Sequence, residues 1–314
     1  MDTSNYYFLI VAEELNISRA AKRLFISQQC LSNHIKRLEQ QYGVLLLNRK
    51  PRISLTPAGK ALVASFQQMQ RLESNLKEQL KELESVDNGV INMGIHMSRA
   101  QILVPLIIPP YRIQYPNVSV SIMDGLTSEF EKHIISGKLD LFIGLNPSNH
   151  PLFTSYTLLQ EDVYLVISDQ MLQTYFPSEY PFVIDRFRQG IDLHEFIDIP
   201  FTFYHEDSNL NSSISTNLAS SGVSLRTVLK VNGNGMHIEL SAMNLAACFA
   251  PQMFLPFIAR INRLDEGGSR LYTFPIKNFT QPNRLCLVHH KDLYISRYLQ
   301  KFITSIIELF ERLY

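Results

Sequence analysis

The order of apolar and polar positions divides the chain into a helical N-terminal part and a longer part of alternating strands and helices. Apolar residues recur at helical spacing over Asn5–Leu15, which predicts a first helix. Two short helices follow within Ser18–Arg52, one over Ser18–Leu24 and one over Ser27–Glu39. A serine opens each of these two and can cap its free amides, which is the arrangement of a helix-turn-helix motif.

The second of these helices has two chemically different faces. Leu31, Ile35 and Leu38 recur at the i, i+4, i+7 spacing that turns one face inward. The remaining surface carries side chains that can hydrogen-bond base edges or phosphates. The candidate DNA contacts here are Ser27, Gln28, Gln29, Ser32, Asn33, Lys36 and Arg37.

A basic turn follows the helix-turn-helix. Two short strand-like arms within Leu45–Thr56 flank Arg49, Lys50 and Arg52, as in winged variants of the motif. Cations in a wing contact the DNA backbone or enter the minor groove, and their contribution to affinity falls with salt. An exposed hairpin without a role is the alternative interpretation.

A long helix is predicted from Thr56-Pro57 to about Val86, since proline is favoured at the first helical position. Apolar residues repeat along it with a seven-residue period, and others fill a second seam. The first set is Leu62, Met69, Leu76 and Leu83, and the second is Phe66 and Leu80. This pattern predicts a coiled-coil dimer helix, although such a stripe could also pack on its own domain. Asp87-Asn88-Gly89 is expected to end it.

From Val90 onward the pattern becomes that of an α/β unit. Strands are predicted at Val90–Ile95, Val118–Met123, Leu139–Leu145, Val163–Ser168, Phe201–His205, Leu225–Val231, Ala246–Ala250, Leu271–Phe274 and Leu285–His289. A closing helix is predicted over Ser296–Leu313. Pro109-Pro110 should kink or end the helix that follows Ser98, because proline removes a backbone donor.

Charge is distributed unevenly along a chain whose formal net charge is zero. Residues 1–60 carry nine basic and four acidic side chains, a net +5, and the remaining residues balance them. A basic N-terminal part suggests nucleic acid as partner, with a merely solvated surface as the alternative. No apolar run is long enough to cross a membrane, and the N-terminus lacks the features of a signal peptide. A cytoplasmic location is therefore expected, with no membrane partner.

Neither the cysteines nor the histidines predict a cofactor or a metal site. Cys30, Cys248 and Cys286 are far apart and odd in number, which argues against a disulfide framework. Cys248 and Cys286 are interpreted as buried small hydrophobes, and a redox pair is the alternative. His289 and His290 should point to opposite faces of a strand, so they are poorly placed to share one ion.

These residues together resemble the family of LysR-type transcriptional regulators over essentially the full length of the chain. The family pattern of spaced small, polar and apolar residues is present throughout the first 59 residues. It comprises Ala20-Ala21, Leu24, Ser27-Gln28, Ser32, Ile35, Leu38-Glu39, Gly43, Leu45, Arg49 and Leu55-Thr56-Pro57-Ala58-Gly59.

The resemblance implies a multi-domain protein with an all-α winged helix-turn-helix domain, a long linker helix and an α/β effector domain like a periplasmic binding protein. The domains are expected at 1–56, 57–88 and 89–314. The effector domain would have two halves, about 90–163 plus 268–314 and 164–267. The expected partners are double-stranded DNA, a small-molecule effector, RNA polymerase, and other copies of the chain in a dimer through the linker helix and a tetramer of dimer pairs.

The chain departs from the family pattern at a few positions. Gln29 and Asn33 stand where proline and arginine are usual, so the DNA sequence that is recognised should differ. A late turn of the effector domain has Asn244-Leu245-Ala246 where two glycines are common. Asparagine tolerates the left-handed conformation, so we expect this turn to persist at its first position.

The effector is expected in the cleft between the two halves, near loops that link strands to helices. Free amides and the positive helix end favour anions there, and an inward-pointing Arg99 would favour a carboxylate-bearing ligand, so a small organic anion is the expected effector. The resemblance carries the family's cleft contacts over to Ser98 and Arg99, and Thr127 and Ser128 match a second contact region. The other candidate contacts are Gln101, Asn146, Tyr204 and His205. The alternative is that Ser98, Thr127 and Ser128 are only helix caps and that Arg99 is solvated.

The preferred function is therefore a sequence-specific transcriptional regulator in which a sensed small molecule alters DNA binding or bending. Alternatives are an architectural DNA-binding protein without a ligand, or a solute-binding or enzymatic α/β domain fused to a DNA-binding module. The chain shows none of the dinucleotide-binding, nucleophile-elbow or P-loop motifs of common α/β enzymes, so an enzyme is not expected.

Overall fold

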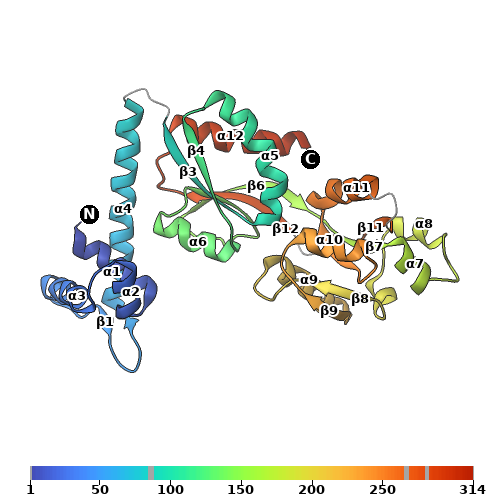
Figure 1. The fold of residues 1–314 in the computed structure, drawn as a ribbon, viewed down its shortest axis with the longest axis horizontal. Coiled ribbons are helices and arrows are strands. Elements are labelled where there is room, and N and C mark those ends of the chain that lie inside the picture. The colour runs from blue at the N-terminus through green and yellow to red at the C-terminus, as the bar shows by residue number, and fades with distance from the viewer. Residues whose placement is uncertain (1, 84–87, 265–268, 280–282, 314) are drawn as a thin grey trace. The chain divides into compact units, whose positions relative to one another are not determined.

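A computed structural model describes residues 2–83, 88–264, 269–279 and 283–313. The chain forms two compact units, which are described separately. The first contains the chain up to Asn88, and the second contains almost all of the chain from Gly89 onward. The predicted combination of a helical winged domain, a long helix and a two-part α/β domain is confirmed (Figure 1). Among the described residues, no helix is both long and apolar enough to cross a membrane.

The N-terminal unit consists of short helices, a wing and a long helix. In chain order these are α1 (Thr3–Glu14), α2 (Ile17–Arg23), α3 (Gln28–Tyr42), β1 (Leu47–Asn48), β2 (Ser54–Leu55) and α4 (Pro57–Leu83). Phe8, Leu31, Ile35 and Leu38 are at most 1% exposed and form the core of this unit. Gly43, at a φ of 68°, ends α3 in the left-handed conformation that glycine adopts without strain.

The long helix α4 divides its apolar residues between two environments. Phe66 is buried in the N-terminal core, where its ring meets that of Phe8 edge to face, so its predicted place in a dimer seam is wrong. Farther along, a stripe of apolar side chains is 50–80% exposed, made of Met69, Leu72, Leu76, Leu80 and Leu83. The predicted end of the helix at Val86 and Asp87 lies outside the described residues.

The first half of the α/β unit is built on a five-stranded sheet of order β4-β3-β5-β12-β6. Its strands are β3 (Gly89–Ile95), β4 (Val118–Met123), β5 (Leu141–Leu145), β6 (Phe153–Glu161) and β12 (Asn283–His290). β3 pairs in parallel with β4 and β5, and β12 is antiparallel to β5 and β6. The helices of this half are α5 (Met97–Gln114), α6 (Thr127–Ser136) and α12 (Arg297–Leu313).

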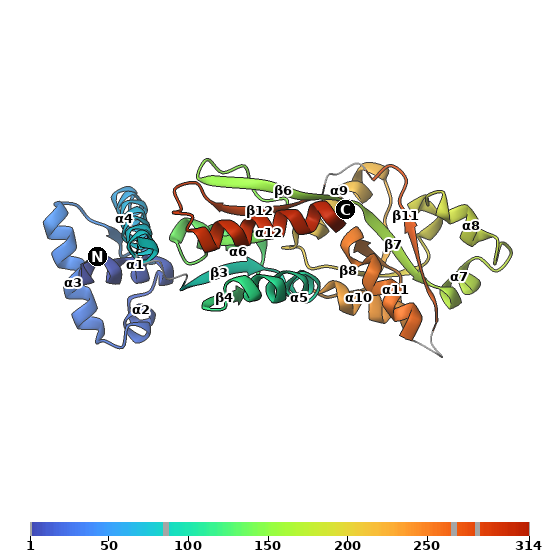
Figure 2. The same cartoon turned by 90° about the horizontal axis from the view of Figure 1, so that it is seen from above.

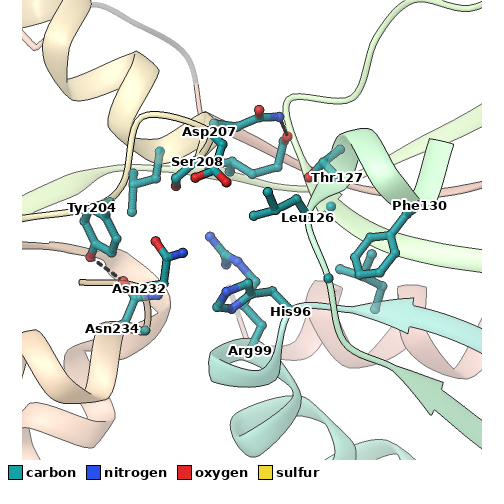
Figure 3. Close-up of a pocket in the computed structure, with 17 residues that line it drawn as sticks. His96, Arg99, Leu126, Thr127, Phe130, Tyr204, Asp207, Ser208, Asn232 and Asn234 are labelled. Carbon is teal, nitrogen blue, oxygen red and sulfur yellow. Dashed lines mark hydrogen bonds between the residues drawn. The ribbon is translucent and has the colours of Figure 1, made fainter. Parts of the chain in front are cut away.

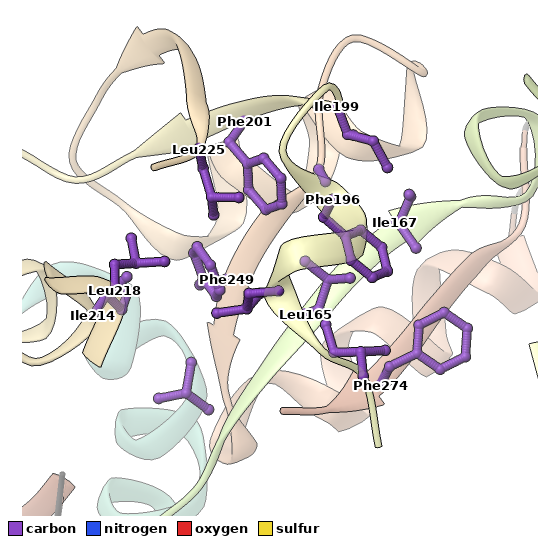
Figure 4. Close-up of a cluster of buried hydrophobic side chains, with 14 of the residues drawn as sticks. Leu165, Ile167, Phe196, Ile199, Phe201, Ile214, Leu218, Leu225, Phe249 and Phe274 are labelled. Atoms are coloured by element: carbon purple, nitrogen blue, oxygen red, sulfur yellow. The ribbon is translucent and has the colours of Figure 1, made fainter. Parts of the chain in front are cut away.

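The second half contains a three-stranded sheet of order β10-β7-β11 and a parallel pair, β8 with β9. These strands are β7 (Val163–Ser168), β8 (Pro200–Phe203), β9 (Arg226–Lys230), β10 (Cys248–Pro251) and β11 (Leu271–Pro275). The helices are α7 (Asp169–Tyr175), α8 (Val183–Arg188), α9 (Asn209–Ser221), α10 (Asn234–Ala242) and α11 (Leu255–Leu264), with short 3-10 turns at Leu193–Phe196 and Gln252–Phe254. A core rich in phenylalanine, including Phe196, Phe201, Phe249 and Phe274, holds this half together (Figure 4).

The two halves meet where one extended segment crosses between their sheets. β6 belongs to the five-stranded sheet and β7, beginning two residues after β6 ends, to the three-stranded sheet. Figure 2 shows the two strands following one another along this crossing. Glu161 is the last residue of β6 and therefore lies at the crossing.

Three features of this unit differ from the sequence-based expectation. β6 was not predicted, because Phe153–Glu161 mixes polar and apolar residues and is half solvated on an edge strand. β11 pairs with β7, so it belongs to the second half, and the boundary predicted at residues 267 and 268 lies outside the described residues. Helix α5 does not end at Pro109-Pro110, one of the two outcomes expected there, but runs through Pro105, Pro109 and Pro110 to Gln114.

The continuation of α5 has a packing explanation. Leu103, Ile107 and Tyr111 follow one another at four-residue intervals and are each at most 2% exposed. Tertiary packing of such a face supplies most helix stability and outweighs the hydrogen bonds that the prolines remove. Another prediction is confirmed elsewhere: Asn244 adopts the left-handed conformation, with φ 62°.

Candidate functional site

Helix α3 presents a polar face to solvent while its apolar face is buried. Gln28, Gln29, Asn33, Lys36 and Arg37 are all exposed, together with Ser27 at the N-cap, and Ser32 is half-buried. The Ser27 hydroxyl accepts a hydrogen bond from the amide of Cys30, which fixes the start of the helix. The structure thus brings the predicted α3 contacts together on one accessible surface.

The cap of the preceding helix differs from the prediction. The side chain of Asn16, not that of Ser18, accepts a hydrogen bond from the amide of Arg19 at the start of α2. Ser18 lies inside the first turn, and its hydroxyl donates to the side-chain oxygen of Gln28 at 3.0 Å. This bond links the first turns of the two helices of the motif.

The wing is held against α3 by a buried carboxylate. Glu39, only 7% exposed, accepts hydrogen bonds from the amides of Leu46 and Leu47 as β1 begins, at 2.9 and 3.4 Å. Its second oxygen lies 3.3 Å from the guanidinium of Arg49. Arg49 therefore has a structural partner as well as a 62% exposed side chain.

The other two wing cations differ from Arg49. Lys50 and Arg52 are exposed, and within the described N-terminal residues neither takes part in an ion pair. Their full charges are therefore available to phosphates.

A cavity of about 70 Å³ lies between the two halves of the α/β unit (Figure 3). One water needs at least about 10–15 Å³ of such volume, so the cavity has room for a small molecule. The first half contributes His96, Arg99, Gly125, Leu126, Thr127, Phe130, Ile143, Gly144 and Leu145. The second half contributes Tyr204, Asp207, Ser208, Asn209, Leu210, Asn232, Gly233 and Asn234.

Three of the predicted effector contacts line this cavity, namely Arg99, Thr127 and Tyr204. Five do not line it: Ser98, Gln101, Ser128, Asn146 and His205. Gln101, Ser128 and His205 are exposed to solvent.

The other two of the five make structural hydrogen bonds. Ser98 accepts a hydrogen bond from the amide of Asn234 at 3.2 Å and so joins the two halves. Asn146 exchanges hydrogen bonds with the backbone of Arg284 at its amide and its side-chain oxygen, both at 2.8 Å.

Arg99 extends into the cleft, but a buried carboxylate neutralises its charge. Its two terminal nitrogens donate to the two oxygens of Glu161, at 3.3 and 2.7 Å. The side chains are 7% and 0% exposed. One oxygen of Glu161 also accepts the amide of Met253 at 3.1 Å, so this carboxylate connects the first half with the second.

The amides at the start of α5 are also engaged. The amide of Met97 donates to the carboxylate of Asp124 at 2.7 Å, and that of Ser98 donates to Nδ1 of His96 at 3.3 Å. Because Nδ1 accepts, a neutral His96 carries its proton on Nε2. Burial is the main cause that lowers the pKa of His96. The negative charge of Asp124 raises this pKa, and the positive charge of Arg99 lowers it.

Across the cleft, the second half supplies an aromatic ring and side-chain amides. The Tyr204 hydroxyl shares its single proton between the side-chain oxygen of Asn234 and the carbonyl oxygen of Phe249, at 2.6 and 2.9 Å. Burial raises the pKa of Tyr204 well above the usual value. Asn209 donates to the carbonyl of Leu145 at 2.7 Å. Asn232 accepts from the amide of His205 at 3.3 Å.

Sequence reasoning missed six polar lining residues: His96, Asp207, Ser208, Asn209, Asn232 and Asn234. Most lie directly after a strand or at the first turn of a helix, as Asn209 does in α9 and Asn234 in α10. The strand-to-helix rule that singled out Ser98 and Thr127 could have found His96 at the start of α5 as well as the residues of the second half. Glu161 gave no such signal, because it lies at the end of a strand that was itself not predicted.

The cysteines and histidines form neither a close redox pair nor a group of metal ligands within the described residues. Cys248 in β10 and Cys286 in β12 are buried in different sheets, and burial raises the pKa of the Cys248 thiol. In the described part of the chain, no three histidine, cysteine or carboxylate side chains are grouped as metal ligands.

Two family models match the chain and together span almost all of it. The model described as "LysR substrate binding domain" matches residues 84–311, and "Bacterial regulatory helix-turn-helix protein, lysR family" matches residues 5–60. An uncharacterized HTH-type transcriptional regulator of Bacillus subtilis, YwbI, is 26% identical over 92% of this chain and 90% of its own length. The Hca operon transcriptional activator HcaR of Escherichia coli is 31% identical over 56% of each chain.

Solved structures share the fold. A full-length OxyR variant from Pseudomonas aeruginosa matches with a TM-score of 0.66 and 19% identity, over 99% of this chain and 95% of that one. Full-length CbnR in complex with its target DNA matches with a TM-score of 0.53 and 20% identity, over 99% and 100%. Because the substrate-binding model alone covers well over half of the residues, the chain belongs to the LysR family of transcriptional regulators, a family of DNA-binding proteins and not of enzymes.

Proposed function

We propose that this LysR-type regulator reads base edges through the exposed face of α3, and that a small molecule in the cleft changes how the DNA is held. The observation that carries the proposal is the exposed polar face of α3 beside a wing whose Lys50 and Arg52 form no ion pair with any described residue. Ser27, Gln28, Gln29, Ser32, Asn33, Lys36 and Arg37 would contact bases and phosphates, and Arg49, Lys50 and Arg52 would contact the backbone. Amide side chains suit adenine edges in the major groove.

The cleft supports the sensing part of this proposal. It lies between two halves linked by crossing strands, and it is lined from both, so an occupant would contact both at once. A ligand that binds one arrangement of the halves better than another shifts the population toward it. Thr127 and Tyr204 remain our proposed contacts among those predicted from sequence, joined by Asp207, Asn232 and Asn234. Arg99 lines the same cavity but is paired with Glu161.

The chain is also proposed to dimerise through α4, with residues 1–56, 57–88 and 89–314 as DNA-binding, linker and effector domains. Five apolar side chains exposed along a single helix favour burial against a second copy, as in coiled coils. Dimers would place two α3 helices on successive turns of DNA, and pairs of dimers would form tetramers. Cytoplasmic location and contact with RNA polymerase complete the proposal.

Selection from a random DNA library tests the reading role of α3. The wild type is expected to enrich one motif with two half-sites. Gln28→Ala, Gln29→Ala and Ser32→Ala combined should remove that enrichment while the dimer persists, because base-edge contacts are lost. Gln40→Ala with Gln41→Ala, exposed at the far end of the same helix, is the matched control and should keep the motif. An unchanged motif in the triple variant would overturn the assignment of α3.

The dimer proposal has its own test in sedimentation analysis. Leu76→Asp adds a charge to the exposed stripe and should shift the protein toward monomer. Ser74→Asp adds the same charge on a different face of α4 and should leave the dimer intact. Equal behaviour of the two variants would contradict dimerisation through this stripe.

A further inference from the structure

Two features of the cleft usually recognise anions, namely the Arg99 guanidinium and the amides at the start of α5. Both already form hydrogen bonds within the protein. Both terminal nitrogens of Arg99 are bonded to Glu161, inside a pair that is almost fully buried. A charge-assisted bidentate pair of this kind is the same interaction that Arg99 would offer a ligand carboxylate. An incoming anion that displaced Glu161 would leave that carboxylate buried without its partner, which is costly. An anion that bound the remaining N–H groups of Arg99 would lie beside the negative charge of Glu161.

The second anion-binding feature, the start of helix α5, is occupied in the same way. The carboxylate of Asp124 accepts a hydrogen bond from the amide of Met97, and the ring of His96 accepts one from the amide of Ser98. Asp124 thus already supplies the negative charge that a helix N-terminus favours. A ligand carboxylate placed here would meet a like charge.

The remaining polar lining of the cleft consists of neutral groups and one carboxylate, that of Asp207. Thr127, Ser208, Asn209 and Asn232 offer hydroxyl and amide groups, and His96 offers a ring donor. Asp207 is exposed and forms no ion pair with any described residue. Figure 3 shows Asp207 and Ser208 across the cavity from Arg99 and His96. The net charge of the lining, with Glu161 counted beside Arg99, is therefore negative.

We infer that the effector of this cleft is a small neutral molecule rich in hydroxyl or amide groups, and not an organic anion. Asp207 and the side-chain amides would exchange hydrogen bonds with it, while Leu126, Phe130 and Ile143 cover its apolar part. The carboxylate of Glu161 occupies the place on Arg99 that a ligand carboxylate would otherwise take. This inference rests on the proposed function and replaces the anionic ligand expected from the sequence.

The test compares trios of probes that share a carbon skeleton, measured by calorimetry and thermal shift on the full chain. The trios are lactate, lactamide and propane-1,2-diol; succinate, succinamide and butane-1,4-diol; benzoate, benzamide and benzyl alcohol. In the wild type, the neutral members of a trio are expected to bind about tenfold or more tightly than the carboxylate, the effect of one charge-assisted contact. A wild type that prefers carboxylates overturns the inference.

Glu161→Gln is the decisive variant, because it frees the charge of Arg99 without changing the shape of its partner. It should bind carboxylates at least about tenfold more tightly than the wild type does. Carboxylate binding that is equal in the two proteins, or absent from both, overturns the inference even if no neutral probe binds. Asp207→Asn, at an exposed position, should give a smaller gain for the same probes and does not disturb the buried pair.

Failure of the inference can be distinguished from failure of the proposed function. Carboxylates that bind the wild type and change its affinity for the selected DNA would refute the neutral-ligand inference and leave the sensor intact. A Glu161→Gln variant that gains carboxylate binding while no ligand alters DNA affinity would support the inference about the cleft and count against the sensor. The double variant Arg99→Met, Glu161→Leu lacks both charges and should show no carboxylate gain.

Discussion

The exposed face of α3 and the cleft of the α/β unit both carry polar side chains, but they hold them differently. On α3, Gln29 and Lys36 project from one helix into solvent. In the cleft, Arg99 bonds to Glu161 and Asn234 bonds to the hydroxyls of Tyr204 and Ser98, with each pair joining distant parts of the chain. The side chains of the first surface are therefore accessible to a partner, whereas many polar groups of the second are already hydrogen-bonded within the protein.

This difference means that residue type is a better guide to chemistry on α3 than in the cleft. An arginine on an exposed helix face keeps its charge, so its role can be inferred from its position. An arginine in a cleft can have its charge cancelled by a residue 62 positions away, as Arg99 does with Glu161. The predictions below test this contrast, beginning with the largest expected effect.

Arg99→Ala should lower the free energy of unfolding by about 3–5 kcal/mol, because it leaves Glu161 buried without its partner. Chemical denaturation of the full chain measures this loss. Arg99→Met with Glu161→Leu removes both charges and is expected to be nearly neutral. A wild-type-like Arg99→Ala would show that Glu161 does not depend on Arg99, and the contrast with α3 would fail.

Protonation of a buried histidine gives the next effect. His237 contacts Thr202 and the carbonyl of Val231 through its two ring nitrogens, at 2.7 and 3.0 Å. Burial lowers its pKa from 6.5 to about 4. The unfolded chain therefore binds more protons between these values, so stability is kept above pH 6.5 and falls as the pH drops toward 4.

The loss attributable to His237 is about 3 kcal/mol when that range has been crossed. Denaturation at a series of pH values measures it, with His237→Gln as the comparison, because His96 and His289 shift in the same direction and titrate in both proteins. The variant should have a flatter profile than the wild type. Parallel profiles would contradict a neutral, buried His237.

The wing cations should contribute through salt-dependent binding. Lys50→Ala with Arg52→Ala should reduce the slope of log affinity against log salt by about 2, since each phosphate contact releases a counterion. Fluorescence anisotropy with the selected DNA measures the slope. Among the three single variants, Arg49→Ala should change the slope less than Lys50→Ala or Arg52→Ala does, because Glu39 already partners Arg49. Equal slope changes in the three single variants would contradict this distinction.

The smallest effect is expected at the helix cap. Asn16→Ala should cost about 1 kcal/mol of stability, because its side chain accepts the amide of Arg19. Ser18→Ala is the control and should cost less, since its hydroxyl bonds an exposed glutamine. Denaturation of both variants compares them, and a larger loss at Ser18 would support the cap expected from the sequence.

The N-terminal unit was predictable because its signals are local. The burial of Leu31, Ile35 and Leu38 follows from helical spacing, and the strand pair of the wing follows from its short arms. The predictions that were wrong involve tertiary contacts, which residue spacing does not indicate. Phe66 fits the seven-residue pattern, yet its ring packs against that of Phe8 in the N-terminal core.

The α/β unit shows where local signals stop. Buried strands such as β5 were predicted because both of their faces are apolar, but the solvated edge strand β6 lacks that signal. The prolines of α5 indicated a kink or an end, and the packing of Ile107 and Tyr111 accounts for the helix not ending there. The charge state of the cleft depends on Glu161 at the end of β6, so it could not be inferred from Arg99 alone.

A genome-wide map of binding sites in the native host, for the wild type and for the triple variant of Gln28, Gln29 and Ser32, tests the central claim most directly. That claim is that α3 gives this regulator its sequence specificity. The wild type should occupy discrete sites that share a motif of paired half-sites, and the triple variant should lose them. Occupancy spread evenly along the chromosome, or the same sites retained by the variant, would contradict it.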